Sequence, residues 1–197
     1  MNRDPGELKP AVVFARCISW IGHPLVFITL SVGIIVALRL ANRAGLALSL
    51  TLLATVVLPM TLLLFRGVQS GRWSDPDVSI HAERVRFYPW SISISGLAVI
   101  ALLLSGAPSF ALRGATVTLF LLILAALINF RMKLSLHALF AFYSGVILFV
   151  VSPVAGTVAF ILALLVFWSR LYLNRHDFSE TLVGACLGLL GGLVTAW

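Results

Sequence analysis

Residues 90–130 read WSISISGLAVIALLLSGAPSFALRGATVTLFLLILAALINF. This stretch has a single charged residue, Arg113, and a single turn signal, SGAP at 105–108. A transmembrane helix needs about 20 consecutive apolar residues, so the stretch is long enough for two. Glycine and proline are typical of the turn that would join them. The stretch therefore predicts a helical hairpin that crosses a membrane twice.

The composition of the whole chain also indicates a membrane protein. Hydrophobic residues make up 60% of the 197 residues and charged residues only 11%, whereas about a quarter of the residues of a soluble domain are charged. The mean hydropathy of +1.07 is spread along the chain and is not concentrated in one anchor. These values exclude a soluble globular domain. They predict an all-α, polytopic transmembrane helical bundle of about six to seven spans.

Further apolar runs lie on both sides of the hairpin. They cover residues 25–40, 46–65, 138–168 and 181–197. The run at 138–168 is long enough for a second hairpin, and Pro59 is expected to kink the run that contains it. Residues 1–23 are expected to form a polar N-terminal and interfacial segment. Residues 24–197 are expected to form a single transmembrane domain.

Polar residues gather in three segments between the apolar runs. These segments are residues 66–89, 131–137 and 169–180. Because an even number of predicted crossings separates each segment from the next, all three open on the same face. All seven acidic residues fall on this face. The site of any polar chemistry is therefore expected at one membrane surface.

The chain is basic, with 14 Lys and Arg against 7 Asp and Glu and a formal net charge of +7. In a membrane protein such an excess faces anionic headgroups or an anionic substrate. No basic stripe is interleaved with aromatic residues, which argues against a nucleic-acid partner. Cys17 and Cys186 lie alone in apolar runs, and their spacing suits neither a metal site nor a disulfide framework. We expect no cofactor and no metal.

The third polar segment contains the residue types of a nucleophilic site. It reads SRLYLNRHDFSE, with His176 four residues before Glu180. If the last helix starts here, both side chains share a face, and the carboxylate can fix the imidazole tautomer. The other imidazole nitrogen can then attack phosphorus. Arg170 would bind phosphoryl oxygens as a bidentate donor.

The other two segments add an acid and several cations. The second segment reads RMKLSLH, which places His137 at the start of a helix with Ser135 and Lys133 beside it. A helix N-terminus favours a bound anion. With an ordinary pKa of about 6.5, His137 could protonate a leaving oxygen near neutral pH. The first segment supplies Arg84 and Arg86.

Each of these residues taken alone also has a structural interpretation. The histidines could be interfacial residues, and the arginines could be cations at helix ends that reach the headgroups. The combination favours function, since two histidines, a carboxylate and several cations converge on one face of a chain that otherwise avoids polar groups. His23 and His81 are expected to be structural.

The third segment closely resembles the last signature of the type 2 phosphatidic acid phosphatase superfamily, S-R-x5-H-x3-D, with Glu180 in place of the aspartate. The middle signature, P-S-G-H, is similar to residues 134–137, which keep Ser135 and His137. The first signature, K-x6-R-P, resembles residues 77–85 only in its arginine, Arg84.

The resemblance implies a helical bundle with all three signatures at one membrane surface, and an enzyme that uses no metal. It implies that His176 becomes phosphohistidine, that Glu180 orients it, and that His137 protonates the leaving group. The implied phosphate ligands are Arg84, Arg170 and Ser135.

Two departures from the signatures concern charge and backbone. Asp77 reverses the charge of the family's lysine, and Leu136 replaces a glycine whose backbone approaches the phosphate closely. Lys133 or Arg86 could supply the missing cation. Glu180 adds one methylene relative to aspartate and would need a slightly more distant helix. We expect divergence within an active subgroup.

The predicted function is a metal-independent membrane phosphatase that hydrolyses a lipid phosphate or diphosphate, such as a phosphatidic acid or a polyprenyl diphosphate. The alternative is a catalytically silent lipid-binding or transport protein of the same fold, in which the cations bind headgroups without turnover. We expect an integral protein of the bacterial inner membrane. Its expected partners are the lipid bilayer and a lipid phosphate substrate.

Overall fold

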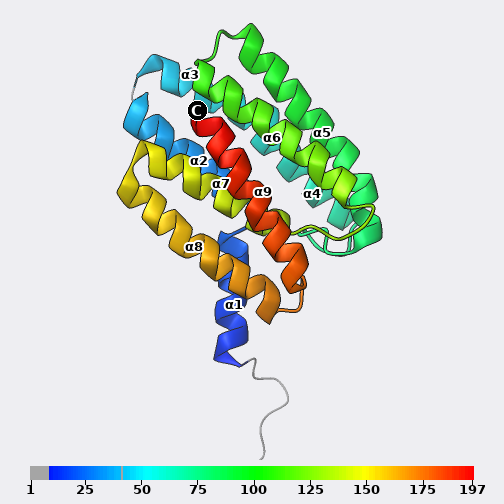
Figure 1. The fold of residues 1–197 in the computed structure, drawn as a ribbon. Coiled ribbons are helices and arrows are strands. Elements are labelled where there is room, and N and C mark those ends of the chain that lie inside the picture. Colours follow the sequence, from blue (N-terminus) through cyan, green and yellow to red (C-terminus); the bar gives the residue numbers. More distant parts are fainter. Residues whose placement is uncertain (1–8, 41) are drawn as a thin grey trace, which may run out of the picture.

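The computed structural model describes residues 9–40 and 42–197, which form a helical bundle (Figure 1). The α-helices are α1 (Pro10–Ile21), α2 (Pro24–Arg39), α3 (Arg43–Leu52), α4 (Leu58–Gln69), α5 (His81–Leu104), α6 (Ser109–Ile128), α7 (Leu136–Val151), α8 (Pro153–Tyr172) and α9 (Phe178–Ala196). A π-helical segment, η1 (Leu53–Val57), joins α3 to α4. The described residues contain no strand, which confirms the predicted all-α class.

Five helices are long and apolar enough to cross a membrane. They are α5, α6, α8, α9 and the 27-residue helix Arg43–Gln69, which comprises α3, η1 and α4. A sixth span results if α1 and α2, which bend by 56° at their junction, cross together. Helix α7 is apolar but has only 16 residues. The described chain therefore has five to six candidate spans, against the six to seven predicted.

Both predicted hairpins are present. Helices α5 and α6 are joined at residues 105–108, where Gly106 has a φ of +64°, a left-handed conformation that glycine adopts without strain. Helices α7 and α8 are joined at Ser152, whose side chain caps α8 by accepting the Ala155 N–H at 3.4 Å. Each hairpin returns the chain to the end of the bundle from which it started.

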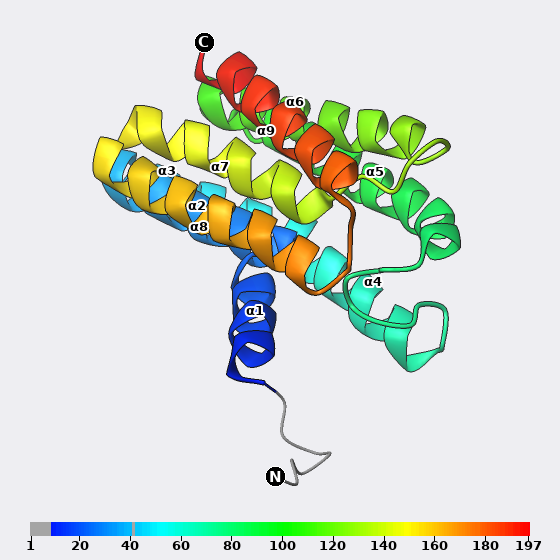
Figure 2. The same ribbon diagram turned by 60° about the horizontal axis from the view of Figure 1, so that its bottom comes forward.

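Helix α7 is the centre of the bundle. It contacts α8, α9 and α2, and the two ribbon views show it between α8 and α9 (Figures 1 and 2). Every residue from 137 to 146 is buried, and a helix surrounded in this way is apolar on all sides. His137 is therefore held inside the protein by the first turn of α7.

Glycines bring α9 into direct contact with the backbone of α7. Gly184, Gly188 and Gly192 recur every four residues along α9. A Cβ at Gly188 would lie 2.1 Å from the Leu139 carbonyl oxygen, and a Cβ at Gly184 would lie 2.6 Å from that of Ser135. Small residues at this spacing allow close helix approach in membranes. The contact fixes the start of α9 against the start of α7.

The first polar segment forms a shorter loop than predicted. The sequence indicated a loop over residues 66–89, but the ends of α4 and α5 leave only residues 70–80 between them. Arg84 and Arg86 are helical, and Pro89 lies inside α5. The polar residues suggested a loop, but this part of the chain is helical: Arg84 is buried in the bundle and Arg86 is exposed. Membrane helices tolerate an internal proline when the freed carbonyl finds another partner.

The structure has a π-helical segment where the sequence predicted a kink. Proline has no N–H to donate to the carbonyl four residues earlier. Pro59 follows η1 directly, in the first turn of α4. Segments of this kind occur where the regular helical hydrogen bonding is interrupted.

Helix α1 extends away from the rest of the bundle (Figure 2). It contacts α8 and buries Ala15, Ile18 and Ser19. Residues 1–8 of the predicted polar N-terminal segment lie outside the described residues. The end of α1 that joins α2 is therefore the part that can contribute to a site inside the bundle.

Candidate functional site

The three polar segments contact one another. The segment before α7 bonds to both of the others, since the Leu134 carbonyl accepts from Arg84 and Lys133 Nζ donates to the Arg175 carbonyl at 2.7 Å. The outer two segments are joined by an ion pair between Arg175 and Asp75 at 3.0 Å. The convergence predicted by counting helices is therefore present in the fold.

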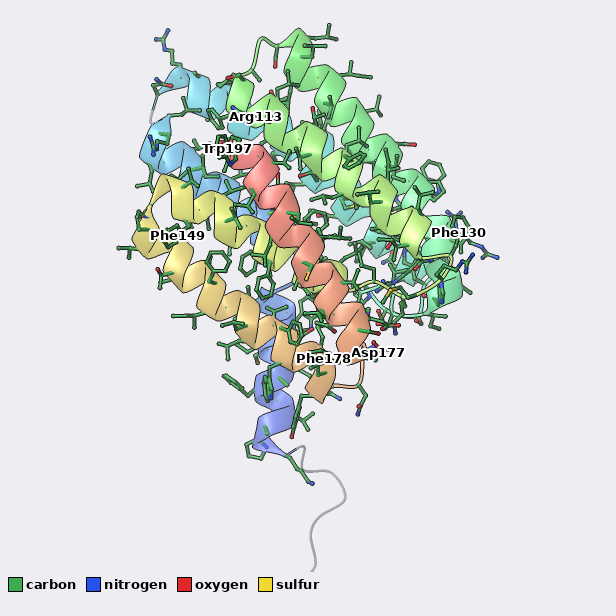
Figure 3. All side chains as sticks on the ribbon, in the orientation of Figure 1. Arg113, Phe130, Phe149, Asp177, Phe178 and Trp197 are labelled. Carbon is green, nitrogen blue, oxygen red and sulfur yellow. The ribbon has the colours of Figure 1, made fainter. Side chains whose placement is uncertain are left out.

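This polar region lies at one end of the bundle. Figure 3 shows Phe130 and Asp177 toward this end, with Arg113 and Trp197 toward the other. The separation follows from the two hairpins, which place the loops after α4, α6 and α8 together. Side chains from α5, α7, α8 and α9 can therefore meet at this end.

His176 lies in this region with its two ring nitrogens in different surroundings. Nδ1 is 2.8 Å from a Glu180 carboxylate oxygen and 3.0 Å from the Lys133 carbonyl oxygen. Both neighbours are acceptors, so we assign the proton to Nδ1. Nε2 is then unprotonated, and its lone pair accepts a long hydrogen bond from Arg84 Nη2 at 3.5 Å. This tautomer leaves Nε2 able to act as a nucleophile.

Glu180 reaches His176 by a different route from the one predicted. The two residues do not share a helix face, because α9 begins at Phe178, after His176. Asp177 caps α9 by accepting the Glu180 N–H at 2.8 Å, and the Glu180 carboxylate accepts the Asp177 N–H at 3.3 Å. This capping box turns the carboxylate back toward the residues before the helix. Glutamate is the acid that a capping box uses at this position, which accounts for the additional methylene.

Burial keeps His176 neutral. The residue is 6% exposed, and its pKa is lowered to about 2, first by desolvation and then by the charges of Arg84, Arg170 and Lys133. A nucleophilic imidazole has to be unprotonated at the attacking nitrogen. The site therefore holds His176 in its reactive protonation state at neutral pH.

Arg84 is a buried cation held in one orientation. It is 2% exposed. Its Nε donates to the Val78 carbonyl at 3.0 Å, and its Nη1 donates to the Leu134 carbonyl. These bonds leave Nη2 facing His176. A fixed cation beside a nucleophile can stabilise negative charge that develops on a phosphoryl group.

Arg170 of α8 is a second buried cation, 1% exposed. Its Nη1 donates to Ser19 Oγ at 2.6 Å and pairs with Asp77 at 2.7 Å. Its Nε and Nη2 are buried and have no hydrogen-bond partner within residues 9–40 and 42–197. Buried donors without a partner are rare in proteins. Oxygens of a bound anion would satisfy both.

Asp77 lies between Arg170 and His137. One carboxylate oxygen pairs with Arg170, and the other is 3.5 Å from His137 Nε2. This contact is not a hydrogen bond, and His137 Nε2 has no hydrogen-bond partner elsewhere in the described chain. Asp77, which reverses the charge of the lysine in the first signature, therefore lies next to Arg170, a predicted phosphate ligand, and His137, the predicted proton donor.

Two residues that the sequence analysis did not select also belong to this cluster. Ser19 accepts from Arg170, and the His23 ring lies edge-on to His137 with centroids 5.5 Å apart. His23 also has the structural role expected of it, since Nδ1 accepts the Leu25 N–H at 3.3 Å as the cap of α2. The available signal was the His23-Pro24 interruption between two apolar runs. His81 Nε2 forms a hydrogen bond with the Asn129 carbonyl.

The remaining predicted site residues have different surroundings. Lys133 is partly buried beside Glu180, and desolvation lowers its pKa. Ser135 caps α7, because its Oγ accepts the Ala138 N–H at 3.4 Å. Arg86 is exposed and lines a separate shallow depression with Arg72, Trp73 and Trp90. Lys133 and Ser135 therefore lie at the cluster, whereas Arg86 lies apart from it.

An apolar cavity of about 730 Å³ opens from the cluster into the bundle. Its polar end is lined by His23, Asp77, Arg84 and His137. Apolar side chains of α2, η1, α5 and α7 line most of the remainder, which extends to Arg113 and Thr195 at the other end of the bundle. The charged cluster thus adjoins a long apolar space.

Metal ligands do not gather in the part of the chain that the structure describes. No group of three or more His, Cys, Asp or Glu side chains there is arranged to hold a metal ion. Cys17 and Cys186 are both free and exposed.

No protein-family model, curated protein or solved structure matches this chain.

Proposed function

We propose that the protein is a membrane phosphatase that hydrolyses a lipid phosphate or diphosphate through a phosphohistidine at His176. The observation that carries the proposal is the arrangement around the imidazole. Glu180 holds the proton on Nδ1, and the Nε2 lone pair faces the fixed guanidinium of Arg84. Acceptors at Nδ1 keep Nε2 unprotonated, as a nucleophile must be, and a nearby cation can stabilise the charge of a phosphoryl group.

The proposed reaction has two steps. The negative charge of a bound phosphate favours the protonated form of His137. Nε2 of His176 attacks phosphorus and forms a P–N bond, the bond from phosphorus to the lipid oxygen breaks, and protonated His137 gives that oxygen its proton. Water then attacks the phosphohistidine, releases inorganic phosphate and restores the imidazole, while His137 takes back a proton. Arg84 and Arg170 stabilise the charge on the phosphoryl oxygens. Glu180 stabilises the imidazolium character that develops on His176.

The cavity supports a lipid as the substrate. The cluster lies at the polar end of an apolar space of about 730 Å³. A hydrophobic tail in that space would be in contact with apolar side chains, and it would hold the attached phosphate at the cluster. A small soluble phosphate ester would leave the space unused. We therefore assign the space to the acyl or prenyl chain.

The resemblance to the type 2 phosphatidic acid phosphatase superfamily is consistent with these roles. The last signature supplies Arg170, His176 and Glu180, which the fold brings into the cluster. The first signature supplies Arg84. We propose that the chain is a divergent member of this superfamily. Its third-signature acid is Glu180, which belongs to a capping box, and Asp77 stands where the first signature has a lysine.

We further propose that the bundle lies in the bacterial inner membrane with the cluster near one membrane surface. The five to six apolar helices that are long enough to cross a membrane support this placement. Helix α7 would lie within the protein without spanning the hydrocarbon layer alone, because its 16 residues are covered by α2, α8 and α9.

The test is release of inorganic phosphate by the purified protein from phosphatidic acid and prenyl diphosphates in the presence of EDTA. The wild type is compared with His176→Ala and with His81→Ala, a matched histidine that contacts the Asn129 carbonyl. We expect turnover in the wild type and His81→Ala, and a loss of at least about a hundredfold in His176→Ala. Lipid binding without phosphate release in every protein would favour the silent lipid-binding alternative.

A further inference from the structure

The anion-binding groups of the cluster already hold an anion that belongs to the chain itself. The two oxygens of Asp77 contact Arg170 Nη1 at 2.7 Å and His137 Nε2 at 3.5 Å. A carboxylate presents two oxygens in a plane, as one edge of a phosphoryl group does. Asp77 therefore occupies the place that the phosphoryl oxygens of a substrate would need.

The Asp77 carboxylate does not satisfy all of the hydrogen-bonding groups around it. Arg170 is 1% exposed, yet its Nε and Nη2 receive no hydrogen bond acceptor from the described chain. His137 Nε2 is unsatisfied in the same way. A phosphoryl group has more oxygens than a carboxylate and could satisfy groups that Asp77 leaves unpaired. The pocket is thus better matched to a larger anion than to its present occupant.

Asp77 is carried by a segment whose attachments can be released. The preceding Trp73 is buried and bonds to the Leu63 carbonyl at 3.4 Å, and α5 begins at 81. Between them, residues 74–79 are held to the loop after α8 by Arg175, which forms a partly exposed ion pair with Asp75 at 3.0 Å and donates to Ser79 Oγ at 2.9 Å. An exposed ion pair contributes little stability. We call residues 74–79 the lid.

The backbone of the lid is strained in this position. Val78 has a φ of +47°, in the left-handed region that a β-branched residue rarely adopts. The Val78 carbonyl accepts from Arg84 Nε at 3.0 Å, which helps to hold the strained conformation. Strain of this kind persists only while surrounding contacts maintain it.

We propose that Asp77 is a displaceable stand-in for the substrate phosphate, and that a lipid phosphate binds by driving the lid out of the anion site. This inference rests on the proposed function, because it assigns the same cluster to a phosphate. In the closed state, Arg84, Arg170 and Lys133 face the two carboxylates of Asp77 and Glu180. When Asp77 leaves, Glu180 is the one of these two carboxylates that still faces the three cations. The open site then has an excess of two positive charges, which favours a doubly charged headgroup.

Displacement has a quantitative signature. If only a fraction of molecules is open, every ligand loses the same factor in affinity, whatever its charge. A fixed carboxylate that stayed in the site would instead repel a dianionic headgroup more than a monoanionic one. The two cases can be separated by comparing headgroups of different charge.

The experiment measures binding of phosphatidic acid and phosphatidylglycerol with identical acyl chains in detergent micelles, at about pH 8, where a terminal phosphate carries two charges. All proteins carry His176→Ala so that no lipid is consumed. Asp77→Asn is compared with the parent and with Asp177→Asn, which removes an acid at the same end and keeps a good helix cap. We expect Asp77→Asn to tighten binding of both lipids by a common factor of about ten or more, and Asp177→Asn to leave both unchanged.

A second variant does not alter the pocket. Asp75→Asn weakens the ion pair between the lid and Arg175 and keeps an amide oxygen that can accept from Ser79. We expect it to tighten binding of both lipids by a smaller common factor, and to add little in the Asp77→Asn background, since the two changes act on the same opening.

The results that overturn the inference are distinct. If Asp77→Asn leaves affinity unchanged, or tightens phosphatidic acid much more than phosphatidylglycerol, the lid is not displaced, and the proposed function is unaffected. If neither lipid binds to any of the proteins, the proposed function and the inference both fail.

Discussion

At the scale of single residues, the cluster depends on keeping charges buried without a full set of partners. Arg84 and Arg170 are each at most 2% exposed, and burying a charge costs free energy unless it is paired. His176 avoids this cost by remaining neutral. Its neutrality follows from its surroundings, because burial and three neighbouring cations oppose protonation. The same surroundings make the protein sensitive to acid.

We expect the folded state to lose stability as the pH falls below about 6.5, the ordinary pKa of histidine. The pKa of His176 is about 2 in the folded protein, so the unfolded chain binds the proton first, and stability falls with pH by up to about 1.4 kcal/mol per unit from this group. The measurement is the thermal unfolding midpoint in detergent between neutral and mildly acidic pH. The fall should be shallower in His176→Gln, and equal slopes in the two proteins would contradict the assignment.

At the scale of helices, the start of α9 is positioned by its glycines. The α9 backbone approaches α7 so closely that a Cβ at Gly188 would lie 2.1 Å from the Leu139 carbonyl oxygen. The same approach brings the Ser135 N–H within 3.2 Å of the Glu180 carbonyl oxygen. Helix contact and site geometry are therefore coupled through α9, and a change far from His176 can alter the site.

We expect Gly188→Val to destabilise the protein by about 1–3 kcal/mol, the usual cost of overfilling a well-packed contact. It should also reduce phosphate release, because α9 would be pushed away from α7. Thermal unfolding and activity in detergent are the measurements. The control is Gly33→Ala in α2, where a Cβ would meet nothing within 4 Å and no loss of stability is expected. Equal stability of the two variants would mean that α7 and α9 are not held in this contact.

At the scale of the whole molecule, the main feature is the long apolar cavity, which continues from the charged cluster into the bundle. The cavity of about 730 Å³ runs from the cluster toward Arg113 and Thr195 at the other end. Residues of α2 to α7 and of α9 contribute to its walls. A space of this kind distinguishes ligands by the length and shape of their apolar part.

We expect Ser95→Leu to reduce activity more on long-chain than on short-chain phosphatidic acid. Ser95 lines the cavity and is buried, so a larger side chain there shortens the space available to a tail. The ratio of kcat/KM for the two chain lengths should fall by about tenfold. Leu97→Phe, at an exposed position on the same helix, is the control and should leave the ratio unchanged. A constant ratio in Ser95→Leu would place the tail outside the cavity.

Several features followed from the sequence by itself. The apolar runs determined the all-α class. The turn residues at 105–108 indicated the first hairpin, and the length of the run at 138–168 indicated the second. Their reliability has a physical cause, because a bilayer leaves helices as the main way to satisfy backbone polar groups. Counting crossings was enough to predict that the three polar segments meet. The sequence also predicted that His176 pairs with Glu180, although the capping box of α9 and not a shared helix face brings them together.

Other features depended on the tertiary structure. Polarity suggested that Arg84 and Arg86 lie in a loop, but only the packed bundle showed one arginine buried and the other exposed. The positions of Ser19, His23 and Asp77 beside Arg170 and His137 depend on contacts between α1, α7, α8 and the lid. Sequence periodicity records which residues are apolar within one helix. It does not record which buried polar groups from distant helices share one pocket, because that is decided by how the helices pack together.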